Sequence, residues 1–286
     1  MNAAEVPVPP SSIHPAAPAT QDAQDTASSS APAPAEPMLQ ASDLRRSFGG
    51  VDAVAGASFA VRPGTITGLI GPNGAGKSTV INIIGGQMRP DGGRVLFRGR
   101  EIQGLPPHRV ARAGLVRTFQ TANVFARLTV LENLLLGARP WDGETFHAAL
   151  LGRWFWRRRE TELVDRAESM LDRFGMRRME NDDAGTLSGG QKRILEIMRA
   201  LMSEPVMLLL DEPMAGVNPT LAHTIGDHLH DLRVQGMTML MIEHDLALVD
   251  RLCDSVVVMA QGRVLAEGSL RDLRQSREVL DAYLAG

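Results

Sequence analysis

One nine-residue segment, GPNGAGKST at residues 71–79, has the composition and spacing of a phosphate-binding loop. It matches the pattern G-x-x-x-x-G-K-[ST] at every fixed position, and it follows the apolar run TITGLI and precedes KSTVINII. Glycines allow backbone N–H groups to surround a phosphate, Lys77 can reach β- and γ-phosphate oxygens, and the Ser78 hydroxyl can ligate Mg²⁺. The alternative, a glycine-rich turn with an incidental lysine, does not explain the complete match. The segment therefore predicts binding of a nucleoside triphosphate with Mg²⁺.

A second segment, TLSGGQKRILEIMRAL, has the features of another phosphate-binding helix start. Small residues precede a run in which apolar residues recur at helical spacing, from Ile194 to Leu201. The first turn of such a helix offers free N–H groups and a positive dipole end to an anion. The sequence thus contains two segments suited to binding a phosphate, and the first segment does not account for the phosphate that the second would bind.

Polar residues follow two further apolar runs that are predicted to be buried strands. Asp211 and Glu212 follow VMLLL, and His244 follows MTMLMIE. Ligands in open α/β sheets bind beyond the carboxyl ends of the strands, so these residues are expected near the phosphate loop. Asp211 can anchor Mg²⁺ and Glu212 can polarise a water for attack on the γ-phosphate. Taken singly, Asp211 and Glu212 could instead be a helix cap or surface charges, and His244 could be an ordinary core residue.

Two positions carry weaker signals. Gln120, in VRTFQTANVF, could touch Mg²⁺ or the attacking water while linking two subdomains. Phe48, in RRSFGGVDAV, could stack on an adenine ring or belong to the ordinary core.

The order of strand-like and helix-like segments indicates an α/β fold. Strands alternate with helices from residue 38 onward, which predicts a parallel sheet covered on both faces. A mostly helical stretch, about 121–186, reads as an inserted subdomain, and REVLDAYLAG as a closing short helix. Residues 1–37 contain no Lys or Arg and eight of the 17 prolines, so we expect a disordered Pro/Ala/Ser tail.

Composition limits the function further. A net charge of -3 gives no bulk attraction to nucleic acid, and the single cysteine, Cys253, excludes an internal disulfide. No apolar run approaches the ~18 residues that span a bilayer, so a membrane role would need other chains. One basic, aromatic segment, GRWFWRRRE at residues 152–160, suits either stacked bases or an amphipathic insert facing solvent or lipid headgroups. The acidic balance favours the second reading, and we expect no nucleic-acid partner.

The phosphate loop, a glutamine, LSGGQ, LLLDEP and a downstream histidine, in this order, resemble an ATP-binding cassette (ABC) ATPase subunit. The resemblance covers residues 38–286 and implies a P-loop NTPase, RecA-like core with an antiparallel β subdomain and an inserted helical subdomain. It also implies that two cassettes close head to tail, with LSGGQ of one meeting the ATP held by the other. The implied contacts to the partner-bound ATP are Ser188, Gly189, Gly190 and Gln191.

Four further segments narrow the resemblance to the ATPases of branched-chain amino acid importers: VRTFQTANVFARLTVLENLLLGA, DEPMAGVNP, MIEHDLALV and VLDAYLAG. This branch implies peripheral attachment to the cytoplasmic face of the plasma membrane through permease subunits, a second and paralogous ATPase, and indirectly a solute-binding protein. Asn218 stands where most cassettes have aspartate, and the branch shares this asparagine. The implied ATP-binding residues are Phe48, Val54, Gly71, Pro72, Asn73, Gly74, Ala75, Gly76, Lys77, Ser78 and Thr79. The implied catalytic residues are Glu212, His244 and Gln120, and the implied metal ligands are Ser78, Gln120 and Asp211.

Two other functions remain open from the sequence. An exporter ATPase shares the nucleotide motifs, although IEHD and AGVNP favour import. A soluble ABC protein of translation usually carries two cassettes in one chain, and this sequence shows one. A soluble ABC protein of repair carries zinc cysteines or long coiled coils, and this sequence shows neither.

Overall fold

The computed structural model describes residues 36–118, 124–138, 153–277, 279 and 281, without the side chains of residues 153–159. Nearly all of the tail predicted at residues 1–37 lies outside the described residues. Gln120 lies outside them too, as do the side chains of most of the GRWFWRRRE segment.

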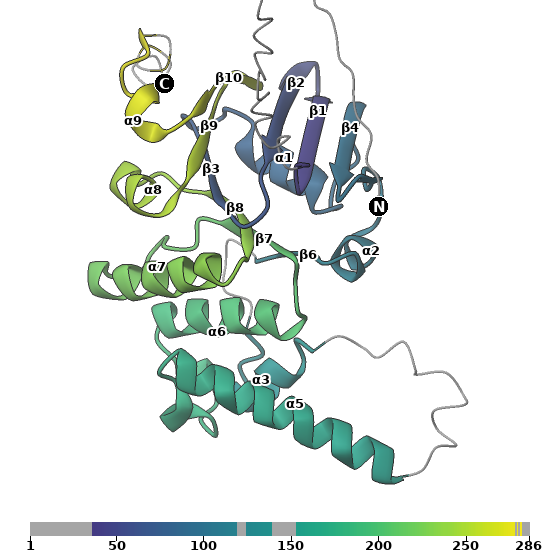
Figure 1. Ribbon diagram of the computed structural model, residues 1–286, viewed down its shortest axis with the longest axis vertical. Coiled ribbons are helices and arrows are strands. Elements are labelled where there is room, and N and C mark those ends of the chain that lie inside the picture. The colour runs from purple at the N-terminus through teal and green to yellow at the C-terminus, as the bar shows by residue number, and fades with distance from the viewer. Residues whose placement is uncertain (1–35, 119–123, 139–152, 278, 280, 282–286) are drawn as a thin grey trace, which may run out of the picture. The chain divides into compact units, whose positions relative to one another are not determined.

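Six strands form the main sheet, in the order β10-β9-β3-β8-β7-β6 (Figure 1). All neighbours pair in parallel except β10, which runs antiparallel to β9. Gln261 and Gly262 close the β9–β10 hairpin with φ of 48° and 74°, as tight two-residue turns require. The predicted parallel sheet is confirmed, with one antiparallel edge strand. The strand bounds are β3 Ile66–Ile70, β6 Leu115–Arg117, β7 Met207–Asp211, β8 Thr238–Ile242, β9 Ser255–Ala260 and β10 Arg263–Gly268.

A separate four-stranded sheet has the order β2-β1-β4-β5, and its strands pair antiparallel. It confirms the antiparallel β subdomain that the family resemblance implied. Its strands are β1 Leu39–Phe48, β2 Val51–Val61, β4 Gly92–Phe97 and β5 Arg100–Glu101.

Helices connect the strands and form most of the described part of the 121–186 stretch. The helix bounds are α1 Lys77–Ile84, α2 Pro107–Arg112, α3 Val130–Leu135, α5 Arg153–Arg173, α6 Gly189–Met202, α7 Pro219–Val234, α8 Leu246–Leu252 and α9 Leu270–Leu273. Two short 3₁₀ turns, Arg177–Met179 and Ala184–Thr186, lie between α5 and α6. The closing helix expected in REVLDAYLAG falls mostly outside the described residues.

Side chains of the central strands alternate between two apolar layers. Leu208 and Met241 belong to the layer that includes α6 and α7, whereas Leu209 and Leu240 pack with α1 and the smaller sheet. Because both faces are covered, every residue of β3, β7 and β8 is buried. Polar chemistry is therefore placed where these strands end, at the carboxyl edge of the sheet.

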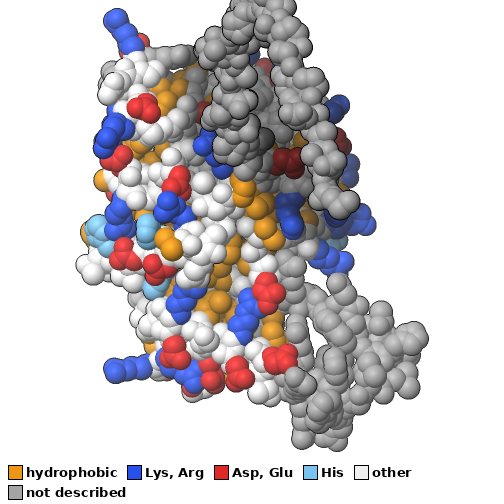
Figure 2. Space-filling view, in the orientation of Figure 1, with side chains coloured by type: hydrophobic (Ala, Val, Ile, Leu, Met, Phe, Trp, Pro, Cys, Tyr) orange, Lys and Arg blue, Asp and Glu red, His pale blue; other side chains and the backbone are white. Residues whose placement is uncertain are grey.

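Charged side chains of both signs lie interspersed over the helical lower part of the face seen in Figure 2. The described side chains there form no continuous basic stripe of the kind that follows a nucleic-acid backbone. Within the described ranges, no helix combines the length and the apolar character that crossing a bilayer requires.

Candidate active site

The loop between β3 and α1 has a backbone that only glycine permits at two points. Gly71 has φ of 147°, and a Cβ there would lie 2.0 Å from the carbonyl oxygen of Met259. Gly76 has φ of 98°, and its Cβ would lie 2.3 Å from the carbonyl oxygen of Ala53. The backbones of strands β9 and β2 therefore pack directly against the loop. Its outer residues, Asn73 and Gly74, are exposed.

Helix α1 begins directly after this loop without a side-chain cap. Gly76 is its N-cap residue and makes no side-chain hydrogen bond, and no acidic residue lies in the first turn. The helix start thus offers its dipole and N–H groups to an anion. Ser78 is exposed and Thr79 is half-buried beside it.

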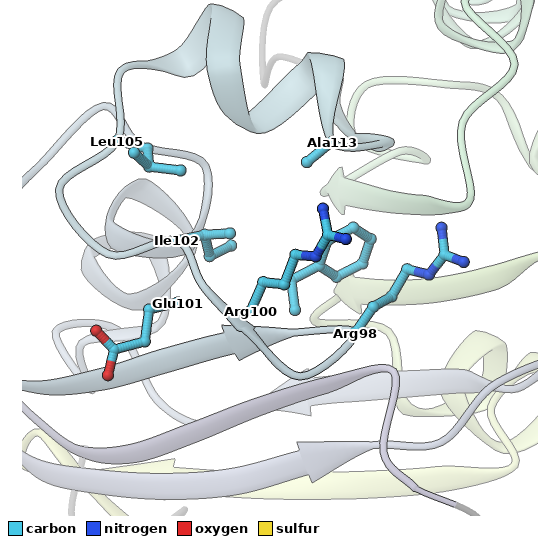
Figure 3. A pocket seen from close by; sticks show the side chains of 7 residues that line it. Arg98, Arg100, Glu101, Ile102, Leu105 and Ala113 are labelled. Carbon is cyan, nitrogen blue, oxygen red and sulfur yellow. The ribbon is translucent and has the colours of Figure 1, made fainter.

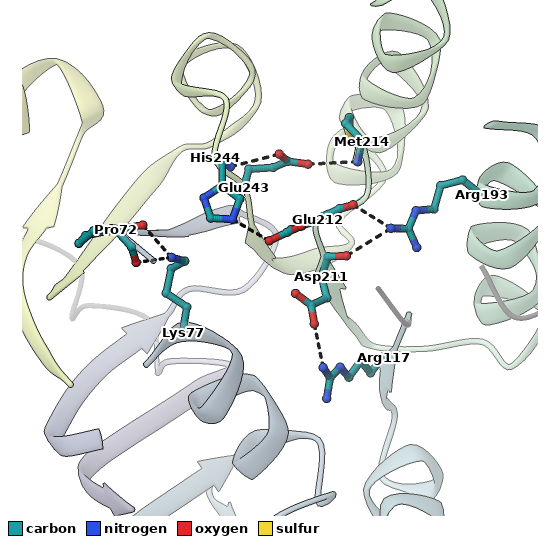
Figure 4. A network of polar contacts seen from close by, with 10 residues as sticks. Pro72, Lys77, Arg117, Arg193, Asp211, Glu212, Met214, Glu243 and His244 are labelled. Atoms are coloured by element: carbon teal, nitrogen blue, oxygen red, sulfur yellow. Dashed lines mark hydrogen bonds and ion pairs between the residues drawn. The ribbon is translucent and has the colours of Figure 1, made fainter. Parts of the chain in front are cut away.

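Lys77 is buried, with 6 % of its surface exposed, and its ammonium group is held by the loop itself. Nζ donates to the carbonyl oxygens of Gly71 and Pro72 at 2.7 and 2.9 Å (Figure 4). Burial lowers the pKa of Lys77, and the charges of Glu212 and Asp211 oppose this shift. The same lysine therefore lies within the field of both carboxylates that the sequence placed at the end of β7.

Asp211 ends β7 and is 3 % exposed. Its Oδ2 accepts from Nη2 of Arg117 at 2.8 Å, and Arg117 also donates to Oδ1 of Asn82 at 2.6 Å and to Oε1 of Gln87. Arg117 was not predicted from the sequence. Its position at the end of the parallel strand β6, three residues before Gln120, was the available signal.

Glu212 and His244 come together although 32 positions separate them. Nε2 of His244 and Oε1 of Glu212 lie 2.6 Å apart, and the two strands that precede them, β7 and β8, are neighbours (Figure 4). Glu212 has φ of 49°, a left-handed conformation that is costly for a residue with a side chain. Its N–H donates to the carbonyl of Ile242 at 3.1 Å, so the loop is joined to the end of β8. A carboxylate with a histidine as its hydrogen-bond partner is a suitable general base.

A buried carboxyl group, Glu243, joins the two loops of this pair. It is 5 % exposed, and its oxygens accept from the backbone N–H groups of Met214 at 3.1 Å and His244 at 3.3 Å. Burial raises the pKa of Glu243, and these two hydrogen bonds oppose the shift. A hollow of about 330 Å³ beside it is also lined by Glu212 and His244. From the sequence, Glu243 was predicted only as part of the strand.

The segment LSGGQ starts α6 with a reciprocal cap. The Ser188 hydroxyl accepts from the N–H of Gln191 at 3.3 Å, and the Gln191 side chain accepts from the N–H of Ser188 at 2.9 Å. Its two glycines differ. A Cβ on Gly190 would lie 2.0 Å from Cδ2 of Leu221 in α7, whereas a Cβ on Gly189 would have no heavy atom within 4 Å. The Cβ direction of Gly190 therefore faces α7 and that of Gly189 is open, while the contact of both residues with a partner's ATP stays a prediction.

Comparisons with known proteins agree with this arrangement. A family model described as ABC transporter matches residues 54–215. The chain is 41% identical to the high-affinity branched-chain amino acid transport ATP-binding protein BraF of Pseudomonas aeruginosa, over 87% of this chain and 98% of that protein. It is 39% identical to a probable branched-chain amino acid transport ATP-binding protein of Archaeoglobus fulgidus, over 86% of this chain and 95% of that one.

The chain belongs to the ABC transporter family. A crystal structure of the ADP conformation of an ATP-binding cassette from an ABC transporter superposes with a TM-score of 0.76 at 37% identity, over 88% of this chain and 100% of that chain. A nucleotide-free cassette gives a TM-score of 0.72, also at 37% identity, over 88% of this chain and 96% of that chain. The expected P-loop NTPase fold is confirmed.

The remaining predicted residues of the cassette vary in their surroundings. Phe48 is 44% exposed at the end of β1, with the Arg46 guanidinium 5.0 Å from its ring centre, so its ring is accessible for stacking. Val54 is only 1% exposed and belongs to the core under the smaller sheet, so its side chain has no open face for a nucleotide. Asn218 caps α7, since its Oδ1 accepts from the N–H of Leu221 at 2.9 Å.

Another hollow of the cassette, about 380 Å³, lies between the β4–β5 hairpin and α2 (Figure 3). Arg98 and Arg100 line it together with Phe97, Ile102 and Leu105. None of the residues that the sequence predicted for nucleotide or metal belongs to this lining.

Proposed function

We propose that this protein binds ATP with Mg²⁺ in the loop at residues 71–79 and hydrolyses it, with Glu212 as the general base. The proposal rests on the 2.6 Å contact between Glu212 and His244, which supports a carboxylate base with a histidine partner at the edge where Lys77 lies. His244 holds the carboxylate, and Glu212 takes a proton from the water that attacks the γ-phosphate. Lys77 stabilises the charge on the β- and γ-phosphate oxygens.

The residues present fit Mg²⁺ in their chemistry. Mg²⁺ prefers oxygen ligands, and the Ser78 hydroxyl and Asp211 carboxylate supply them from the start of α1 and the end of β7. Bound there, Mg²⁺ would neutralise the negative charge of the phosphates. Arg117 holds Asp211 by one oxygen and so fixes the direction of its carboxylate. Gln120, expected to contribute as well, remains a prediction.

We further propose a head-to-tail dimer in which α6 meets the ATP of the partner. A Cβ on Gly189 would point into open space, and Ser188 is exposed beside it, as an interface with a phosphate requires. The branch resemblance favours a paralogous ATPase as the partner, with branched-chain or other small hydrophobic amino acids as the imported solute. The membrane spans would belong to separate permease subunits, through which this protein would attach to the cytoplasmic face of the membrane, with a solute-binding protein on the other side.

A groove of about 420 Å³ suits the contact with a permease segment. Val116 of β6, Phe125 and Leu136 line it on the helical side of the site, with Arg199 and Ala200 of α6. Phe125 and Leu136 are 54% and 56% exposed, so apolar surface is available for a partner of the same character.

Substitution of the proposed base tests the function. Glu212→Gln keeps the shape of the side chain and loses the base, so ATP affinity should persist while steady-state hydrolysis falls at least ~100-fold. Lys77→Ala should instead weaken ATP binding itself, because the phosphates lose their principal cation. Measurement of ATP affinity and turnover for both variants separates the roles. Turnover near that of the unchanged protein in Glu212→Gln would remove Glu212 from the mechanism.

A further inference from the structure

A buried ion pair lies within α6 and begins two residues after the LSGGQ segment. Arg193 and Glu196 are 3% and 2% exposed, and Nη1 of Arg193 lies 2.8 Å from Oε2 of Glu196. Charged residues at such depth are rare unless they are paired, and pairing alone seldom stabilises a fold more than apolar residues would. The position of this pair therefore calls for an explanation beyond packing.

The second arm of Arg193 reaches the loop of the proposed base. Its Nη2 donates to the carbonyl oxygen of Glu212 at 2.8 Å and lies 3.5 Å from the carbonyl oxygen of Asp211 (Figure 4). Glu196 occupies the other arm of the guanidinium and so orients the whole fork. An arginine suits this task because its planar donors have a fixed geometry.

Glu212 has a backbone that needs such support. Its φ of 49° lies in the left-handed region, which a residue with a side chain adopts only where its surroundings impose it. The N–H of Glu212 is bound to the end of β8, and its carbonyl accepts from Arg193 and, at 3.1 Å, from the N–H of Ala215, so the peptide groups on either side of its Cα are both held. Rotation of this backbone would move the carboxylate away from His244.

We propose that Arg193, oriented by Glu196, is a positioning residue that fixes Glu212 for hydrolysis and connects α6 to its own chain's catalytic loop. The inference rests on the proposed role of Glu212 as the base. In the proposed dimer, the start of α6 contacts the partner's nucleotide, whereas Glu212 serves the nucleotide of its own chain. When α6 shifts on meeting the partner's phosphate, Arg193 then transmits that shift to Glu212, at the catalytic site of its own chain.

A paired substitution separates this role from packing. Arg193→Met with Glu196→Met removes both charges together, which avoids a lone buried charge and retains apolar volume. We expect the melting temperature and ATP affinity of the full chain to stay close to their original values. Turnover should fall about 10- to 100-fold, because a displaced catalytic group loses its alignment.

Two further variants control the interpretation. Arg193→Lys keeps a charge for Glu196 but lacks the fork that also reaches the Glu212 carbonyl, so it should lower turnover with little change in KM. Arg166→Met removes another arginine that donates to a carbonyl of α6, that of Leu201 at 3.0 Å, and should leave turnover unchanged. In a Glu212→Gln background, the paired substitution should cause no further loss, since both changes act through one group.

The outcomes distinguish the inference from the proposed function. Unchanged turnover in a folded paired variant overturns the inference, and if that variant does not fold, unchanged turnover in Arg193→Lys overturns it. Full turnover in Glu212→Gln alone would instead refute the proposed base. If the paired substitution lowers turnover further in the Glu212→Gln background, Arg193 acts through a group other than the Glu212 carboxylate, and the inference is overturned.

Discussion

The two glycines of the LSGGQ segment offer a test in which one substitution is made at neighbouring positions. Alanine in place of glycine improves the helical propensity of either position by up to about 1 kcal/mol. At Gly189 the new methyl group meets nothing within 4 Å, whereas at Gly190 it would lie 2.0 Å from Cδ2 of Leu221 and 3.4 Å from Cγ1 of Val217. Carbon atoms in favourable contact lie about 3.5–4.0 Å apart, so Leu221 must move.

The difference between the two variants isolates the packing. The propensity gain is similar in both and largely cancels, which leaves an overpacking cost of about 1–3 kcal/mol for Gly190→Ala relative to Gly189→Ala. Urea unfolding of the full chain measures this difference directly. Equal free energies of unfolding for the two variants would refute the packing argument for Gly190.

Hydrolysis in the assembled transporter then tests the dimer. Gly189→Ala should fold as well as the original chain but should lose at least ~10-fold in turnover once paired with its partner, because the methyl group occupies the approach of the partner's phosphate. The isolated subunit should bind ATP as before. Full turnover in the assembled complex would mean that the open face of Gly189 does not meet a nucleotide.

Two other expectations follow from exposure and from a shifted pKa. Phe125→Asp with Leu136→Asp should sharply reduce co-purification with the membrane subunits, while ATP affinity of the isolated chain persists. The control Val234→Asp, at a 69% exposed apolar position on α7, should leave both co-purification and ATP affinity unchanged. Unchanged co-purification of the first variant would refute the groove as the permease contact. Burial raises the pKa of Cys253 to about 12, so at pH 8 iodoacetamide should label the native chain about 10³-fold more slowly than the urea-unfolded chain, whose thiol has a pKa near 8.5. The native rate should rise about tenfold between pH 8 and pH 9 as the thiolate fraction grows, and rapid labelling of the native chain at pH 8 would contradict the raised pKa of this thiol.

The sequence predicted those parts of the site that depend on local spacing. Lys77 and its loop are specified by nine consecutive residues, and the buried strands β7 and β8 are specified by short apolar runs. The carboxyl-edge rule then places Glu212 and His244 near each other. Their direct contact was not predicted, because it depends on the parallel register that sets Asp211 opposite Ile242.

Contacts between distant segments were missed for a physical reason. Arg117 meets Asp211 across 94 positions and Gly190 meets Leu221 across two helices, and neither pairing leaves a periodic pattern in the sequence. The pairing of Arg193 with Glu196, in contrast, does leave a pattern in the sequence. They stand three residues apart within an otherwise apolar helical stripe, a spacing that brings opposite charges together on one helix face.

Glu212 shows why the site needs both the sheet and the helical part of the chain. Its strained φ follows from the sharp turn that leaves β7, and that conformation persists only while other groups hold it. The sheet supplies two of these groups, the carbonyl of Ile242 and the ring of His244, through the end of β8. Helix α6 supplies a further group through Arg193. Because the same helix begins with the segment that would face a partner's phosphate, closure of the dimer and orientation of the base are expected to be coupled within a single helix.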